Sequence, residues 1–251
     1  MPTPRAWSLA GLAVIAVYLT PPSSSAARPA ASSPSAELFK DAKGKADAEV
    51  NVLVTNHYIH GVPYGLAQGL GPGAVPRLAS ILRDQGMKSY WRTTVQFLNF
   101  VGAPASFPIL REFIVDRFEG EVDFDTYAAI SAAIVTMGPL ARISQPAFQF
   151  LNKGIDPSWW NVVKWTFSYS KSEKRNIQMS RNCLNALASS GMDEADHVLT
   201  ELVRTSSQNR YWGELHDMVD AALKSNREII KEGFDNNRKR RDADGGGKQR
   251  R

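Results

Sequence analysis

The stretch FLNFVGAPASFPILREFI, residues 97–114, decides the fold. Two apolar runs meet at Gly102-Ala103-Pro104, and the second run carries its own proline, Pro108. Apolar residues spaced three and four apart predict one face of a helix. Proline suits a first helical turn because the N–H that it lacks has no partner there. The stretch therefore predicts two helices joined by a tight Gly/Pro turn.

The same hairpin recurs along the chain. A shift of 32 residues places Pro76, in VPRLASILRD (75–84), on Pro108, and a shift of 36 superposes the preceding helices. A more divergent copy runs over 176–204, with Gly191 at its turn. Periods of this length in paired helices predict an α-solenoid, because stacked neighbours bury what one hairpin leaves exposed. The predicted fold is all-α: a right-handed α-solenoid of about four to five antiparallel hairpins.

The segment LGPGAVPRLASILRD, residues 70–84, resembles the HEAT repeat, in particular its short HEAT-like variety. The resemblance extends over roughly residues 56–205 and is most specific at Gly-x-x-Ala-Val-Pro-x-Leu. It implies stacked helical hairpins with a long curved surface that binds other proteins.

The first residues have the layout of a secretory signal peptide. Arg5 precedes an uncharged apolar run of 13 residues (7–19), and small residues suited to cleavage follow at Ser24 and Ala26 or at Ser25 and Ala27. This layout predicts cleavage and export to the periplasm or the extracellular space. An uncleaved anchor is the alternative, although the run is shorter than the ~20 residues that span a bilayer. Cys183 is the only cysteine, which excludes an internal disulfide, and its apolar neighbours predict a buried thiol.

Charge gathers at the C-terminus. RKRRDADGGGKQRR, residues 238–251, holds seven Lys/Arg against two Asp, and the rest of the chain is nearly neutral. We expect a disordered tail in which Arg238, Lys239, Arg240 and Arg241 contact anionic surfaces of the cell envelope, or else a solubilising end.

The predicted organisation has a flexible lead-in before a repeat domain that two further segments interrupt or close. The boundaries are a signal peptide at 1–27, the lead-in at 28–50, the repeat domain at 51–236, an inserted aromatic helix at about 155–170, a closing helix at about 209–234 and the basic tail at 237–251.

Three of the six tryptophans, Trp159, Trp160 and Trp165, fall within the insertion. Tryptophan is enriched at binding hot spots, so we expect these rings to anchor a partner protein, with Arg92 and Arg111 as polar contacts. The other interpretation is that the rings attach the insertion to the solenoid core, because residues 159 and 160 point about 100° apart on a helix.

Signals for chemistry are weak. His57 and His60 have the spacing of a helical metal pair but no second pair of ligands. Asp193 and Asp196 suit a helix N-terminus without catalysis, and His197 lies near that same helix start. The motifs of serine hydrolases, zinc proteases and phosphate-binding loops are missing from the sequence. The sequence thus predicts no enzyme, no cofactor and no bound metal. It predicts an exported scaffold for protein–protein interaction or, as the alternative, an envelope-associated module held by its basic tail.

Overall fold

The computed structural model describes residues 38–206, 211–212 and 216–246, with the backbone alone for 38–46 and 245–246. The predicted signal peptide lies outside the described residues. The all-α prediction is confirmed. The α-helices are α1 (Leu38–Thr55), α2 (Tyr64–Leu70), α3 (Val75–Arg83), α4 (Trp91–Phe100), α5 (Ser106–Arg111), α6 (Phe124–Val135), α7 (Gly138–Ala141), α8 (Gln145–Gly154), α9 (Ser172–Ala188), α10 (Asp193–Ser206), α11 (His216–Glu232) and α12 (Phe234–Gly246).

Short elements complete the described chain. The strands β1 and β2 pair in parallel, so that Gly120 lies opposite Trp165. These elements are the 3₁₀-helices η1 (Pro72–Ala74), η2 (Gln85–Tyr90) and η4 (Pro157–Val162), the π-helix η3 (Glu112–Asp116), and the strands β1 (Gly120–Glu121) and β2 (Trp165–Thr166).

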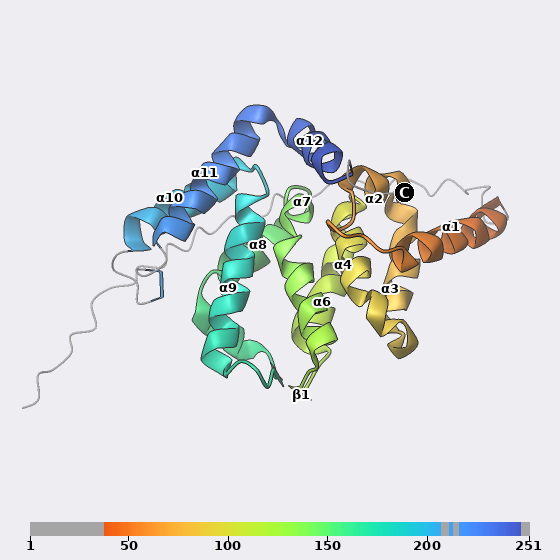
Figure 1. Cartoon of the computed structure of the whole chain (residues 1–251), viewed down its shortest axis with the longest axis horizontal. Coiled ribbons are helices and arrows are strands. Elements are labelled where there is room, and N and C mark those ends of the chain that lie inside the picture. Colours follow the sequence, from red (N-terminus) through yellow and green to blue (C-terminus); the bar gives the residue numbers. More distant parts are fainter. Residues whose placement is uncertain (1–37, 207–210, 213–215, 247–251) are drawn as a thin grey trace, which may run out of the picture. The chain divides into compact units, whose positions relative to one another are not determined.

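Helices α3, α4, α6 and α9 lie side by side, each against the next (Figure 1). Helix α11 then packs against α9, and α10 packs against α11. The facing sides of these helices are apolar and buried, as in Leu98 of α4, Ile130 of α6 and Leu184 of α9. Successive helices thus share one continuous core along the chain, which no single hairpin could form alone.

The Gly/Pro turns lie where the repeat predicts them, but the glycines serve two different needs. Gly102 and Gly191 have φ values of 74° and 59°, a region that side chains with a Cβ rarely adopt. Gly138 instead begins α7, and a Cβ there would lie 2.5 Å from the carbonyl oxygen of Ala186 in α9. The turns at Gly102 and Gly191 therefore need the backbone freedom of glycine, whereas position 138 needs its small size.

Three segments differ from their predicted structure. Part of the expected flexible lead-in is helical: α1 begins at Leu38. The later residues Val50 and Val54 of this helix are fully buried, which holds it against the core. The expected aromatic helix is one short 3₁₀-helix, η4, followed by β2. The part of the expected disordered tail that the structure describes is α12, which packs against α2 and α11. In each segment, contacts with distant elements outweigh local sequence preference.

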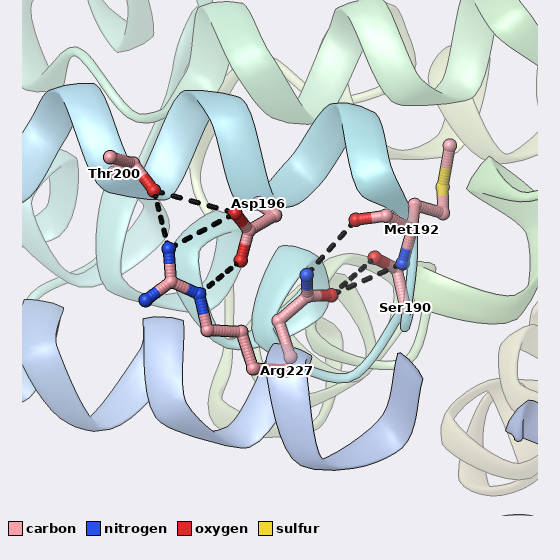
Figure 2. Close-up of polar contacts among 6 residues, drawn as sticks. Ser190, Met192, Asp196, Thr200 and Arg227 are labelled. Atoms are coloured by element: carbon pink, nitrogen blue, oxygen red, sulfur yellow. Dashed lines mark hydrogen bonds and ion pairs between the residues drawn. The ribbon is translucent and has the colours of Figure 1, made fainter. Parts of the chain in front are cut away.

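Helices α10 and α11 are joined by polar contacts that continue into the turn before α10 (Figure 2). Arg227 Nε donates to Asp196 Oδ1 (2.6 Å), and Arg227 also reaches Thr200. The hydrogen bond from Arg227 lowers the pKa of Asp196. The fully buried Asn226 donates to the carbonyl of Met192 (2.9 Å) and accepts from its N–H (3.2 Å). Asn226 therefore supplies hydrogen-bond partners to backbone groups of the turn between α9 and α10.

Substituting Asn226→Ala should lower the free energy of unfolding by about 2 kcal/mol, because it removes the hydrogen bonds of a fully buried amide and leaves the partly buried N–H of Met192 without its partner. Arg227→Ala, one residue along, removes an exposed ion pair and should cost less than about 1 kcal/mol. Urea denaturation followed by circular dichroism measures both. Equal losses for the two variants would contradict this account.

Candidate functional site

The predicted aromatic anchors lie mainly in the core. Trp160 and Trp165 are 0% exposed, and their indole N–H groups donate to the carbonyls of Gly154 and Ile114, each at 2.8 Å. Trp159 is half-buried and packs edge-on against Trp160, with 4.9 Å between ring centroids. The prediction that these rings anchor a partner is wrong for Trp160 and Trp165, which have no surface to offer. The alternative interpretation, attachment of the insertion to the core, is confirmed.

A buried arginine, which the sequence analysis missed, fixes this insertion in place. Arg175 of α9 is 3% exposed and donates to the Trp160 carbonyl (3.3 Å), to the Trp165 carbonyl and to Asn176 Oδ1. Its guanidinium also lies 5.2 Å from the ring of Trp165. Burial lowers the pKa of Arg175. The only signal in the sequence is an arginine in a polar helical turn, which predicts an exposed side chain.

The two arginines predicted as polar contacts are both exposed but lie in different settings. Arg92 lies on α4. Arg111, at the end of α5, pairs with Asp116 at 2.6 Å, with about half of each side chain exposed. Of these two arginines, only Arg111 lines a groove, so the structure does not bring Arg92 and Arg111 together at that site.

That groove, of about 450 Å³, runs between the first turns of α5 and α8. These are the second helices of adjacent hairpins, and each carries a proline in its first turn, Pro108 and Pro146. Phe107 packs edge-on against Phe150 of α8, at 5.8 Å between centroids. The groove is lined by Pro104, Phe107, Pro108, Arg111, Ile143, Ser144, Gln145 and Pro146. We call it the proline groove; it is apolar apart from Arg111, Ser144 and Gln145.

The predicted anionic-surface residues are not a free basic cluster. Arg238 donates to the carbonyl of Ser189 (3.1 Å). Its pKa is lowered to about 10, mainly because the side chain is buried. Arg240 makes two hydrogen bonds to the carboxylate of Glu232, at 2.9 and 3.0 Å. Lys239 and Arg241 are exposed. Half of this predicted set therefore stabilises α12.

Groups that suit metal binding or catalysis are dispersed in the described part of the chain. No three His, Cys, Asp or Glu side chains there are grouped to hold a metal ion. Asp196 is committed to Arg227. Cys183 is fully buried, and burial raises the pKa of its thiol, which makes it unreactive. Within residues 38–206 and 216–246, moreover, no helix has the length and apolarity to cross a membrane.

One serine, histidine and aspartate are close together without forming a usable nucleophile. Ser206 Oγ lies 2.8 Å from His216 Nδ1, and His216 Nε2 lies 3.2 Å from Asp220 Oδ2. A catalytic serine must be reached by its substrate. Ser206 is fully buried, and its hydroxyl donates to the carbonyl of Val203 (2.9 Å). These contacts join the end of α10 to the start of α11.

Comparisons with protein-family profiles, with curated proteins and with solved structures found no match to this chain. Membership of a HEAT-repeat family therefore stays a prediction.

Because Trp165 is a core residue, Trp165→Ala should lower the free energy of unfolding by about 3–5 kcal/mol. Tyr169, an exposed aromatic of the same insertion, is the matched control: Tyr169→Ala should cost less than about 1 kcal/mol. Thermal and urea melts measure both. If the Trp165→Ala protein is as stable as the parent, Trp165 is not a core residue, and its prediction as a binding anchor would stand again.

Proposed function

We propose that this chain is a HEAT-like right-handed α-solenoid of about four to five antiparallel hairpins and acts as an exported, non-enzymatic scaffold for protein–protein interaction. The order of helix contacts supports the repeat architecture. The first helices of successive hairpins, α4, α6 and α9, each pack against the next one along the chain. In repeat proteins each unit contacts its neighbours, and the surface along the stack is left for partners.

The observation that carries the proposal is the proline groove. It lies between equivalent turns of two consecutive hairpins, so the repeat itself generates it. Ile143 at its edge is 47% exposed, although the core lies close by. An apolar slot beside an exposed isoleucine is suited to receive an apolar side chain from another protein.

Arg111 at the same groove indicates the chemistry of the partner. Its ion pair with Asp116 is exposed, and such pairs contribute little to stability, so an acidic group of a partner can replace Asp116 at little cost. Ser144 and Gln145 supply polar groups at the other side. The occupant we infer is a peptide segment of a partner protein, with an aliphatic or aromatic side chain in the groove and a carboxylate at Arg111.

The test is selection of peptides from a random library on the full chain, followed by calorimetry with the purified peptides. Selected peptides should combine an apolar residue with a nearby Asp or Glu. Ile143→Asp should weaken their binding at least about tenfold, because it puts a charge into the slot. Val162, in η4 outside this groove, is the matched control at 53% exposure, and Val162→Asp should bind like the parent.

Two results would overturn the proposal. One is a library that yields no peptide with saturable binding. The other is a set of selected peptides that bind the Ile143→Asp and Val162→Asp proteins equally well, which would place recognition elsewhere on the chain.

A further inference from the structure

A second and larger pocket, of about 710 Å³, lies beneath α12. Its walls come from the loop 56–63, the start of α2, α4 and α12, elements that are distant in the sequence. In Figure 1, α12 extends from α11 toward α2, to which it is tied by contacts. Pockets of this volume are typical of small-molecule sites. The proline groove shares no residue with it, so the two sites are independent.

Part of the lining of this pocket is apolar. Leu53, Val62 and Phe100 form a wall that is buried or half-buried. Ile59 stands at its edge with 72% of its surface exposed, and Leu66 is 38% exposed. Exposed aliphatic side chains that border a formed pocket favour a ligand with an apolar body.

The lining also holds basic side chains. Arg238 and Arg241, one helical turn apart on α12, both line the pocket, as do His57 and His60 of the loop. The one carboxylate of the lining is Asp242, and both of its oxygens are occupied: they accept from the N–H groups of Tyr64 (3.0 Å) and Gly65 (2.9 Å) at the start of α2.

Neither arginine is neutralised by an ion pair. Arg241 is exposed, and within the residues that the structure describes no carboxylate lies at ion-pair distance from it. Arg238 lies 5.8 Å and 5.0 Å from the rings of Tyr64 and Phe234, and its hydrogen bond goes to a carbonyl. The burial that lowers its pKa would be offset by a nearby anion. Two guanidinium groups so placed are suited to hold a carboxylate or a phosphate.

We propose that the pocket beneath α12 binds a small amphiphilic anion, whose carboxylate or phosphate lies at Arg241 and Arg238 and whose apolar body lies along Ile59, Leu66 and Phe100. The ligand needs both an anionic group and an apolar body, because basic side chains form one part of the lining and apolar side chains another.

Calorimetric titration of the full chain at neutral pH and low salt, below the micelle concentration of each probe, tests the proposal. Decanoate and decyl phosphate present the two head groups on the same chain; 1-decanol has the chain without the charge, and acetate and inorganic phosphate have the charge without the chain. Decanoate, decyl phosphate or both should bind saturably at one site, and the tighter of the two identifies the head group. The other three should bind at least about tenfold more weakly.

The variants Arg241→Gln and Lys239→Gln form a matched pair. Both side chains are exposed on α12 and neither makes an ion pair with a described residue, but only Arg241 lines the pocket. Arg241→Gln should weaken binding about tenfold or more, Ile59→Ser should weaken it as well, and Lys239→Gln should leave it unchanged. Circular dichroism should show the same melting for the two α12 variants.

The proposal is overturned if neither charged amphiphile binds saturably below about 1 mM, or if 1-decanol binds as tightly as decanoate. Equal losses for Arg241→Gln and Lys239→Gln would also overturn it, because they would indicate general attraction to a basic helix. Peptide binding at the proline groove is unaffected by either α12 variant under the scaffold proposal, so the two proposals fail separately.

Discussion

The turn that ends α9, residues 189–192, is the point on which three other helices depend. Arg142, which follows α7, donates to the carbonyls of Ser190 (2.9 Å) and Gly191 (2.7 Å), and Arg238 of α12 donates to that of Ser189. Asn226 of α11 completes the set at Met192. The last carbonyls of a helix have no partners within it and carry partial negative charge, so guanidinium groups are well suited to them. One helix end thereby joins a segment from the middle of the chain, at Arg142, to two helices from its C-terminal part.

A similar interaction holds two other arginines, Arg117 and Arg175. Arg117 donates to the carbonyl of Leu82 near the end of α3 and lies 4.5 Å from the ring of Trp91. Burial lowers the pKa of Arg117, as it does for Arg175 and Arg238. In all three, carbonyl oxygens and aromatic faces take the place of a carboxylate, so the positive charge is stabilised without being neutralised. These arginines therefore join elements of the fold without an acidic partner among the described residues.

Local patterns in the sequence predicted the repeated part of the fold. The prolines at 76, 108 and 146 lie in first helical turns, and Gly102 and Gly191 lie in turns with positive φ, because these preferences act within a few residues. The insertion and α12 were mispredicted because long-range contacts determine them. Trp165 reaches a carbonyl 51 residues away, and Asp242 caps a helix that begins 178 residues before it. Composition alone favoured a disordered tail, since RKRR is a run of like charges without an apolar residue to bury.

The position of α12 links stability to the pocket that it covers. Its anchors are few: Asp242 at the start of α2, Arg238 at the end of α9, and Phe234 packed edge-on against Tyr64 at 5.6 Å. A helix held in this way buries little apolar surface of its own, so its docking contributes modestly to folding. A ligand that contacts Arg238, Arg241 and the loop 56–63 together would stabilise the docked position in proportion to its affinity. In the proposed site Arg238 and Arg241 form the closing wall, a role that requires α12 to be ordered and these two charges to be free of ion pairs.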